Sequence, residues 1–318
     1  MVVRLVVDDL RAFRAIEPQL DASSGQQNVH GVTVIGWEQA FNICPADLVI
    51  EAFAVDLPKA YVDAMAAKDL RPAWINLEYL SAESWVGEHH LLPSPHPNLP
   101  LTKYFFFPGF TPDTGGLIRE RDLLNARDGF ISANGTNSLR VFLFGYANAA
   151  GDQLIEAITR LETGARCTVP EGALAETLHR NPAIEKIQFV PQQDFDRLLW
   201  QHDVLFVRGE DSFVRAQWAA KPFIWQIYPQ SENTHWIKLN AFLAIYCGGL
   251  ATEPEAALRE LWRAWNAEDS ANIGAAWRRF MEHLPALQGH ATAWSKKLAE
   301  MPDLAANLLS FYQKTIKI

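Results

Sequence analysis

The chain has 318 residues, of which 49% are hydrophobic and 20% charged, a globular composition that excludes a disordered protein. Its formal net charge of −9 argues against a protein that binds nucleic acid by neutralising phosphates. The length favours two domains over a single core.

The first part of the chain alternates short apolar runs with segments of helical spacing. The runs predicted to be strands are residues 2–7, 31–35, 47–50, 73–77 and 103–107. The last two runs are continuously apolar, as are strands buried on both faces of a sheet. Asp8 and Asp9 are expected to begin a helix, residues 60–68 form another, and four prolines between residues 93 and 100 predict an irregular loop.

A polar stretch at residues 125–138 is interpreted as the linker between a domain of residues 1–135 and a domain of residues 136–318. After it the alternation restarts. The predicted strands are residues 139–144, 166–169, 186–190, 204–207 and 222–227, and helices are expected at residues 152–162, 174–179, 194–201 and 212–220. Strands separated by helices of this length predict a parallel, doubly wound sheet. From about residue 253 the chain is mainly helical.

Ligands of such sheets bind beyond the carboxyl ends of the strands, so the residues that follow each strand are the candidates. Arg208 and Gly209 follow a predicted strand, and Asp211 or Ser212 is expected to cap the next helix. The free N–H groups of that helix and the guanidinium of Arg208 would suit a diphosphate, whereas the Glu210 carboxylate would suit sugar hydroxyls. The alternative is a surface helix capped by its acids, with Arg208 paired to one of them.

A second strand end carries aromatic and amide side chains. Phe189 and Phe195 bracket a proline turn that contains Gln192 and Gln193. Aromatic rings stack nucleobases, and an amide can pair with a pyrimidine edge. The alternative is that both rings belong to the core and Asp194 caps a helix.

Tyr146 and Tyr228 also follow predicted strands, so four strand-end sites would meet in one cleft. No predicted strand is followed by the GxGxxG pattern, which makes a nicotinamide-dependent dehydrogenase a poor alternative.

Signals for a membrane, an export route or a metal are lacking. No apolar run reaches the ~20 residues of a membrane span, and the first residues have no signal-peptide core, so we expect a cytoplasmic protein without membrane contact. The three cysteines are widely spaced, and His89, His90 and His96 fit no metal signature. We therefore expect no metal.

Together these segments resemble the arginine rhamnosyltransferases that modify translation elongation factor P, the EarP family. The matching segments are residues 75–83, 103–110, 114–122, 189–195, 208–217 and 228–230. The resemblance implies an α/β fold of the GT-B type, with two Rossmann-like doubly wound domains facing a cleft and C-terminal helices that pack back on the N-terminal domain. It also implies inverting transfer of L-rhamnose from dTDP-β-L-rhamnose to an arginine of elongation factor P, without a metal or other cofactor.

The family's site residues carry over to matching positions of this sequence. The resemblance assigns the thymine pocket to Phe189, Gln192 and Phe195. It assigns the diphosphate and the sugar to Arg208, Glu210, Asp211 and Ser212, with Glu210 as the catalytic residue, and further donor contacts to Tyr146 and Tyr228. The N-terminal domain would receive the acceptor protein.

The beginning of the sequence departs from the family pattern. The family has an earlier strand and an Asp-Asn-x-Gly-Asp turn that carries the general base, whereas this sequence begins with Met1-Val2-Val3-Arg4. Asp8 and Asp9 are not assigned that role. A guanidinium is a poor nucleophile while protonated, so its attack needs a general base. Because the turn that carries the family's base is not found in this sequence, we expect the chain to bind the donor but to transfer the sugar weakly. The alternative function is a non-catalytic dTDP-sugar-binding relative, or a truncated inactive form, that still binds the elongation factor.

Overall fold

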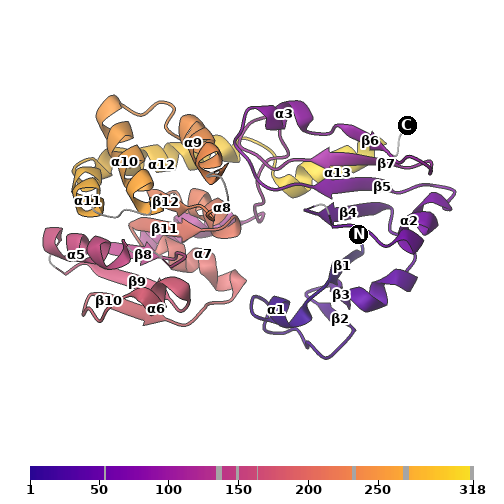
Figure 1. Cartoon of the computed structure of the whole chain (residues 1–318), viewed down its shortest axis with the longest axis horizontal. Helices are drawn as coiled ribbons and strands as arrows, with labels where there is room; N and C mark the ends of the chain where they lie inside the picture. The colour runs from indigo at the N-terminus through magenta and orange to yellow at the C-terminus, as the bar shows by residue number, and fades with distance from the viewer. Residues whose placement is uncertain are drawn as a thin grey trace. The chain divides into compact units, whose positions relative to one another are not determined.

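The computed structural model describes residues 1–53, 55–133, 138–147, 150–162, 164–230, 234–267 and 272–315. These residues form two compact units (Figure 1). Unit 1 contains Met1–Gly116, Val190–Gln193 and Asp303–Ile318, and unit 2 contains Leu117–Phe189 and Asp194–Pro302. The domain boundary expected between residues 135 and 136 lies outside the described residues.

Unit 1 begins with a three-stranded sheet. Its strands are β1 (Val3–Val7), β2 (Gln26–Val29) and β3 (Val32–Gly36), in the order β1-β3-β2. β1 runs parallel to β3, and β2 runs antiparallel to it. The cap predicted before α1 (Leu10–Arg14) is confirmed, since the Asp9 carboxylate accepts from two backbone N–H groups of that helix. β2 escaped prediction because it is a largely polar edge strand.

The second sheet of unit 1 has four strands. They are β4 (Leu48–Ala52), β5 (Ala73–Leu77), β6 (Pro93–Pro95) and β7 (Thr102–Phe106), in the order β4-β5-β7-β6. The first three strands in that order are parallel, and β6 is antiparallel to β7. The prediction of an irregular loop throughout residues 93–100 is thus wrong at its start. The short strand tolerates its prolines because it lies at the sheet edge.

Helices cover this second sheet. Met65 of α2 (Lys59–Ala66) and Trp74 of β5 are buried in one cluster, together with Val49, Val62 and Leu101. α13 (Leu304–Thr315) belongs to the same unit, and its Phe311 ring meets the ring of Tyr104 edge to face at 5.0 Å. Two short elements, the 3-10 helix η1 (Trp37–Asn42) and α3 (Trp85–His89), complete the unit.

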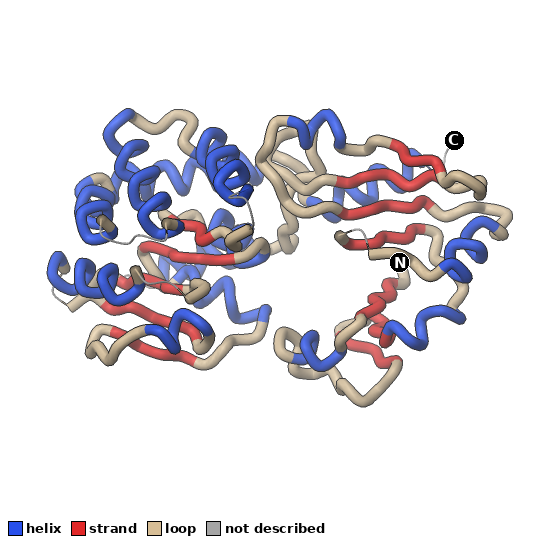
Figure 2. Tube along the Cα trace, viewed as in Figure 1, coloured by secondary structure: helices blue, strands red, loops and turns tan. Residues whose placement is uncertain are grey.

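Unit 2 contains a five-stranded sheet in which every pair is parallel. Its strands are β8 (Arg140–Leu143), β9 (Arg166–Pro170), β10 (Ile184–Ile187), β11 (Val204–Arg208) and β12 (Phe223–Gln226), in the order β10-β9-β8-β11-β12. Figure 2 shows these strands side by side. The α/β class and the parallel sheet predicted from the sequence are confirmed.

Helices alternate with these strands and then continue to the end of the unit. They are α5 (Gly151–Leu161), α6 (Ala173–Thr177), α7 (Gln192–Trp200), α8 (Asp211–Trp218), α9 (Thr234–Tyr246), α10 (Thr252–Asn266), α11 (Ile273–Glu282) and α12 (Leu284–Ala299). Many of the aromatic residues lie in their core, where Trp262 stacks on Phe242 and Trp265 meets Phe206 edge to face. In the described part of the chain, no helix has the length and apolar character needed to cross a membrane.

The linker predicted at residues 125–138 is largely wrong, because α4 (Leu123–Ala133) occupies most of it. Arg127 is buried there and donates to the Trp218 carbonyl at 2.7 Å and to the Ser295 hydroxyl at 2.9 Å. The buried arginine anchors the helix. The prediction was wrong because a polar stretch of this kind resembles a loop when only its sequence is considered. Residues 134–137 of the predicted linker lie outside the described residues.

Candidate functional site

The strand order of the sheet in unit 2 reverses between β8 and β11. The chain first adds β9 and β10 on one side of β8 and then adds β11 and β12 on the other side. Where the strand order reverses in this way, the carboxyl ends of the two central strands leave a crevice that commonly binds nucleotides. Tyr146 follows β8, Arg208 ends β11, and Tyr228 follows β12.

The structure brings these three residues together. The guanidinium carbon of Arg208 lies 4.7 Å from the centroid of the Tyr146 ring, and the rings of Tyr146 and Tyr228 meet edge to face at 5.3 Å. Gln226, at the end of β12, holds the loop in place because its buried side-chain oxygen accepts from the Tyr146 N–H at 2.7 Å. The loop that carries Tyr146 is therefore fixed to a neighbouring strand.

Phe144 belongs to the same group, although the sequence predicted it only as the last residue of a strand. The guanidinium carbon of Arg208 lies 4.5 Å from the centroid of its ring. The same ring lies 6.2 Å from the ring of Phe189 and 6.0 Å from that of Phe195. Phe144 thus connects the two clusters that the sequence predicted separately. The signal was its position, one residue beyond the end of β8.

Phe189 and Phe195 have different environments. Phe189 is 47% exposed, so part of its ring is accessible to a ligand. Phe195 is 7% exposed and packs against Phe142 at 5.9 Å between ring centroids. Gln192 is half-buried and begins α7. Of the two rings, only that of Phe189 has the exposure that stacking on a base requires.

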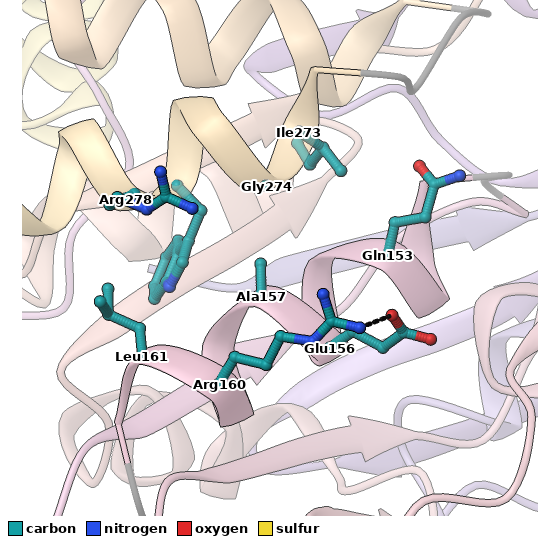
Figure 3. Close-up of a pocket in the computed structure, with 9 residues that line it drawn as sticks. Gln153, Glu156, Ala157, Arg160, Leu161, Ile273, Gly274 and Arg278 are labelled. Atoms are coloured by element: carbon teal, nitrogen blue, oxygen red, sulfur yellow. Dashed lines mark hydrogen bonds and ion pairs between the residues drawn. The ribbon is translucent and has the colours of Figure 1, made fainter.

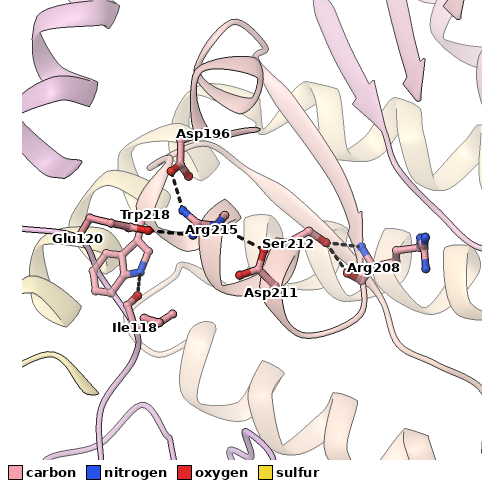
Figure 4. Close-up of polar contacts among 8 residues, drawn as sticks. All are labelled: Ile118, Glu120, Asp196, Arg208, Asp211, Ser212, Arg215 and Trp218. Carbon is pink, nitrogen blue, oxygen red and sulfur yellow. Dashed lines mark hydrogen bonds and ion pairs between the residues drawn. The ribbon is translucent and has the colours of Figure 1, made fainter. Parts of the chain in front are cut away.

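The loop from β11 to α8 differs from its predicted form. Neither Asp211 nor Ser212 is the N-cap residue of α8, since that position belongs to Glu210, whose side chain makes no capping hydrogen bond. Ser212 instead donates its hydroxyl proton to the Arg208 carbonyl and accepts from the Arg208 N–H (Figure 4). Gly209 allows this turn because its φ is +65°, which L side chains rarely adopt.

The side chain of Arg208 has one buried N–H donor that is available to a ligand. Its Nε atom is buried and has no hydrogen-bond partner among the residues that the structure describes. A buried guanidinium N–H without a partner is costly, so it marks a place where a ligand acceptor would bind favourably. Its neighbours in space are aromatic faces, which leave the positive charge available to an anion.

Arg215, inside α8, is the centre of a group of ion pairs (Figure 4). Its guanidinium pairs with Asp196 of α7 at 2.6 Å, with Glu120 at 2.9 Å and with Asp211 at 3.3 Å. Burial raises the pKa of Asp196 to about 6, because three carboxylates share one guanidinium and its attraction does not offset the lost hydration. Arg215 lies within a segment that matches the family, but no local signal in the sequence predicted its role.

A separate hollow of about 330 Å³ lies between α5 and α11 (Figure 3). Arg160, Arg278 and Trp277 line it, and Arg160 pairs with Glu156 at 3.2 Å. The predicted donor-binding residues do not line this hollow. Among the described residues, no group of three or more His, Cys, Asp or Glu side chains is arranged to hold a metal.

Comparisons with known proteins agree on one family. The family model described as elongation factor P rhamnosyltransferase EarP matches residues 1–313. A protein-arginine rhamnosyltransferase of Pseudomonas putida is 46% identical over 347 residues, which cover 99% of this chain and 91% of the relative. Another, from Pseudomonas aeruginosa, is 40% identical over 341 residues, with 98% and 90% covered.

A solved structure gives the same result. It was described as the structural basis for EarP-mediated arginine glycosylation of translation elongation factor EF-P. It is 31% identical in sequence, superposes with a TM-score of 0.62, and covers 98% of both chains. The resemblance found in the sequence is thereby confirmed, together with its GT-B architecture. The chain belongs to the EarP family of glycosyltransferases, the elongation factor P rhamnosyltransferases.

Proposed function

We propose that this chain transfers L-rhamnose from dTDP-β-L-rhamnose to an arginine side chain of translation elongation factor P, with inversion at the anomeric carbon. The observation that carries the donor half is the position of Arg208. It ends a central strand at the switch point of a parallel sheet, lies against two aromatic rings, and has a buried Nε without a described partner. A nucleoside diphosphate satisfies all three features.

The donor's parts match separate groups of side chains. The thymine would stack on the exposed part of the Phe189 ring, with Gln192 pairing to its edge and Phe195 supporting the pocket from the core. The diphosphate would bind Arg208 and the first N–H groups of α8, near Ser212. Glu210 and Asp211 would hold the sugar hydroxyls, and Tyr146 and Tyr228 would complete the walls.

The transfer would be a single displacement. A guanidinium nitrogen of the acceptor attacks the anomeric carbon, the bond from that carbon to the diphosphate oxygen breaks, and dTDP leaves with the electron pair. Arg208 would stabilise the charge that develops on the leaving diphosphate. Because a free guanidinium is protonated at neutral pH, the attacking nitrogen must pass a proton to a carboxylate as the new bond forms. We assign Glu210, at the N-cap position of α8, as the carboxylate that receives this proton.

The test is to incubate the chain with dTDP-β-L-rhamnose and elongation factor P, and to weigh the factor by intact mass spectrometry. We expect the mass of one deoxyhexose to be added, in the presence of EDTA as well, since no metal is part of the proposal. An acceptor whose modified arginine is replaced by lysine is the matched control. Because the acceptor is a translation factor, we place the reaction in the cytoplasm.

An unmodified factor, together with tight dTDP binding in calorimetry, would favour the other candidate, a non-catalytic relative that binds the donor and the factor. Failure to bind dTDP would contradict both functions.

A further inference from the structure

Two large aromatic side chains stand exposed at the carboxyl edge of the four-stranded sheet in unit 1. Phe53 follows β4 and Tyr79 follows β5, the neighbouring parallel strand. Their side chains are 43% and 55% exposed, and their rings stack at 4.2 Å with 20° between the planes. A stacked pair that faces water contributes little to a core, yet the carboxyl edge of a parallel sheet is where ligands bind.

The backbone is held in an unfavourable conformation to present this pair. Phe53 has a φ of +59°, in the left-handed region that a bulky side chain rarely enters. Its N–H donates to the Leu77 carbonyl at 2.8 Å, which extends the β4–β5 pairing past its last regular step and brings Phe53 beside the chain that carries Tyr79. Such backbone outliers persist where the surrounding structure holds them, and they are concentrated at functional sites.

A carboxylate accompanies the rings. Glu78 immediately precedes Tyr79 and is half-buried, and its N–H donates to the Phe106 carbonyl at 2.9 Å. Its Oε1 accepts from the amide of Asn76, which is 1% exposed. The carboxylate is thus anchored by a buried amide, and its other lone pairs can still accept bonds from a partner.

We propose that Phe53, Glu78 and Tyr79 form a docking surface for the arginine-bearing segment of the acceptor protein. A guanidinium is planar and cationic, stacks on aromatic faces and pairs with carboxylates, so its chemistry matches both parts of this surface. Its flat face suits a ring better than the compact ammonium of lysine, which can also pair with a carboxylate but cannot stack. The inference rests on the proposed function, because that function supplies an acceptor protein with an exposed arginine.

The test measures binding of elongation factor P and of dTDP separately, by calorimetry on the full chain. Tyr79→Ala removes the exposed ring, and Phe53→Gly removes its partner while suiting the positive φ. Each change should weaken binding of the factor, and raise KM for it, by about tenfold. The affinity for dTDP should stay the same. Leu70→Ala, at an exposed position of unit 1 away from this surface, is the matched control.

The outcomes separate this inference from the proposed function. If the unchanged chain neither binds nor modifies the factor, the proposed function fails. If it does both, and Tyr79→Ala and Phe53→Gly bind the factor as the unchanged chain does, the docking surface is overturned. Equal losses of factor and dTDP affinity would also overturn it, since they would indicate general unfolding. Tyr79→Phe should bind the factor as tightly as the unchanged chain does, because the ring face and not the hydroxyl makes the proposed contact.

Discussion

Arg215 and Asp196 form an ion pair with 2.6 Å between Nη1 and Oδ2, and it joins α8 to α7. Arg215 is 6% exposed and Asp196 8%. α7 contains Phe195, and α8 directly follows the turn after Arg208. The pair therefore connects the helix of the proposed base pocket to the helix of the proposed diphosphate site, without itself lying at either.

Replacing Arg215 by methionine should destabilise the protein strongly. The change leaves Asp196 buried without its cation, and breaking a buried pair from one side typically costs about 3–5 kcal/mol. The free energy of unfolding in urea, at a pH well above 6, measures this. Arg160→Met is the control, because the Arg160–Glu156 pair is exposed and such pairs contribute about 0–1 kcal/mol. Similar losses in the two variants would contradict the role of Arg215.

The raised pKa of Asp196 predicts a pH dependence of stability. Burial raises this pKa to about 6, so between about pH 4 and pH 6 the folded chain holds a proton that the unfolded chain has released. The free energy of unfolding should therefore fall as the pH rises through this window, by on the order of 2–3 kcal/mol from this group, and then level off.

Asp196→Asn tests this, because it removes the titrating group and keeps a side chain of similar shape. Urea unfolding of both proteins across the window should show the decrease in the unchanged chain only. The same slope in the variant would mean that another group causes it. Glu120 acts in the opposite direction, since Arg215 holds its pKa low despite burial, so the comparison must be between variants and not against a flat line.

The two phenylalanines of the proposed base pocket should separate binding from stability. Phe189 is 47% exposed, so Phe189→Ala should weaken dTDP binding by about 1–3 kcal/mol with little change in stability. Phe195 is 7% exposed, so Phe195→Ala should cost about 3–5 kcal/mol of stability. Calorimetry with dTDP and urea unfolding measure the two effects. Unchanged dTDP affinity in Phe189→Ala would contradict stacking at this ring.

The charge of Arg208 should contribute to the binding of dTDP, which carries a diphosphate, and not to the binding of thymidine, which does not. Arg208→Met should weaken dTDP binding by about 1.5–3 kcal/mol, the range for hydrogen bonds to charged groups, and leave thymidine binding nearly unchanged. Methionine keeps an apolar side chain against the rings of Phe144 and Tyr146, so the packing is largely retained. Equal losses for the two ligands would show that the variant disturbs the fold and not the phosphate contact.

Periodicity predicted the regular elements well, because buried parallel strands are continuous apolar runs. Residues 204–207 illustrate this, since each of the four is fully buried in β11. Elements that polar side chains stabilise were not predicted. The sequence of α4 is polar enough to predict a linker, whereas the helix is held by buried contacts such as that of Arg127 with the Trp218 carbonyl. β2 was not predicted because its outward positions are polar. Such contacts join residues far apart in the sequence.

The site could be predicted only in part for the same reason. Arg208 and Tyr146 were found because each follows a strand, which is a local signal. The contact of Arg208 with Phe144 depends on β8 lying next to β11, and the ion pairs of Arg215 depend on α7 lying next to α8. These are consequences of strand order, which the local pattern does not contain.

Glu210→Gln should separate transfer from nucleotide binding. Glu210 occupies the N-cap position of α8, beside the proposed diphosphate site, and its carboxylate would repel phosphate charge. The neutral amide should therefore bind dTDP as well as the unchanged chain or better. If Glu210 acts on the reacting sugar, the amide should lower kcat for rhamnose transfer by about 10²–10⁴. Single-turnover assays with elongation factor P, read by intact mass, measure the rate. Glu176→Gln, an exposed position on α6, is the control. A variant that transfers at the rate of the unchanged chain would remove Glu210 from the catalytic role, and weaker dTDP binding would instead indicate that its carboxylate supports the loop.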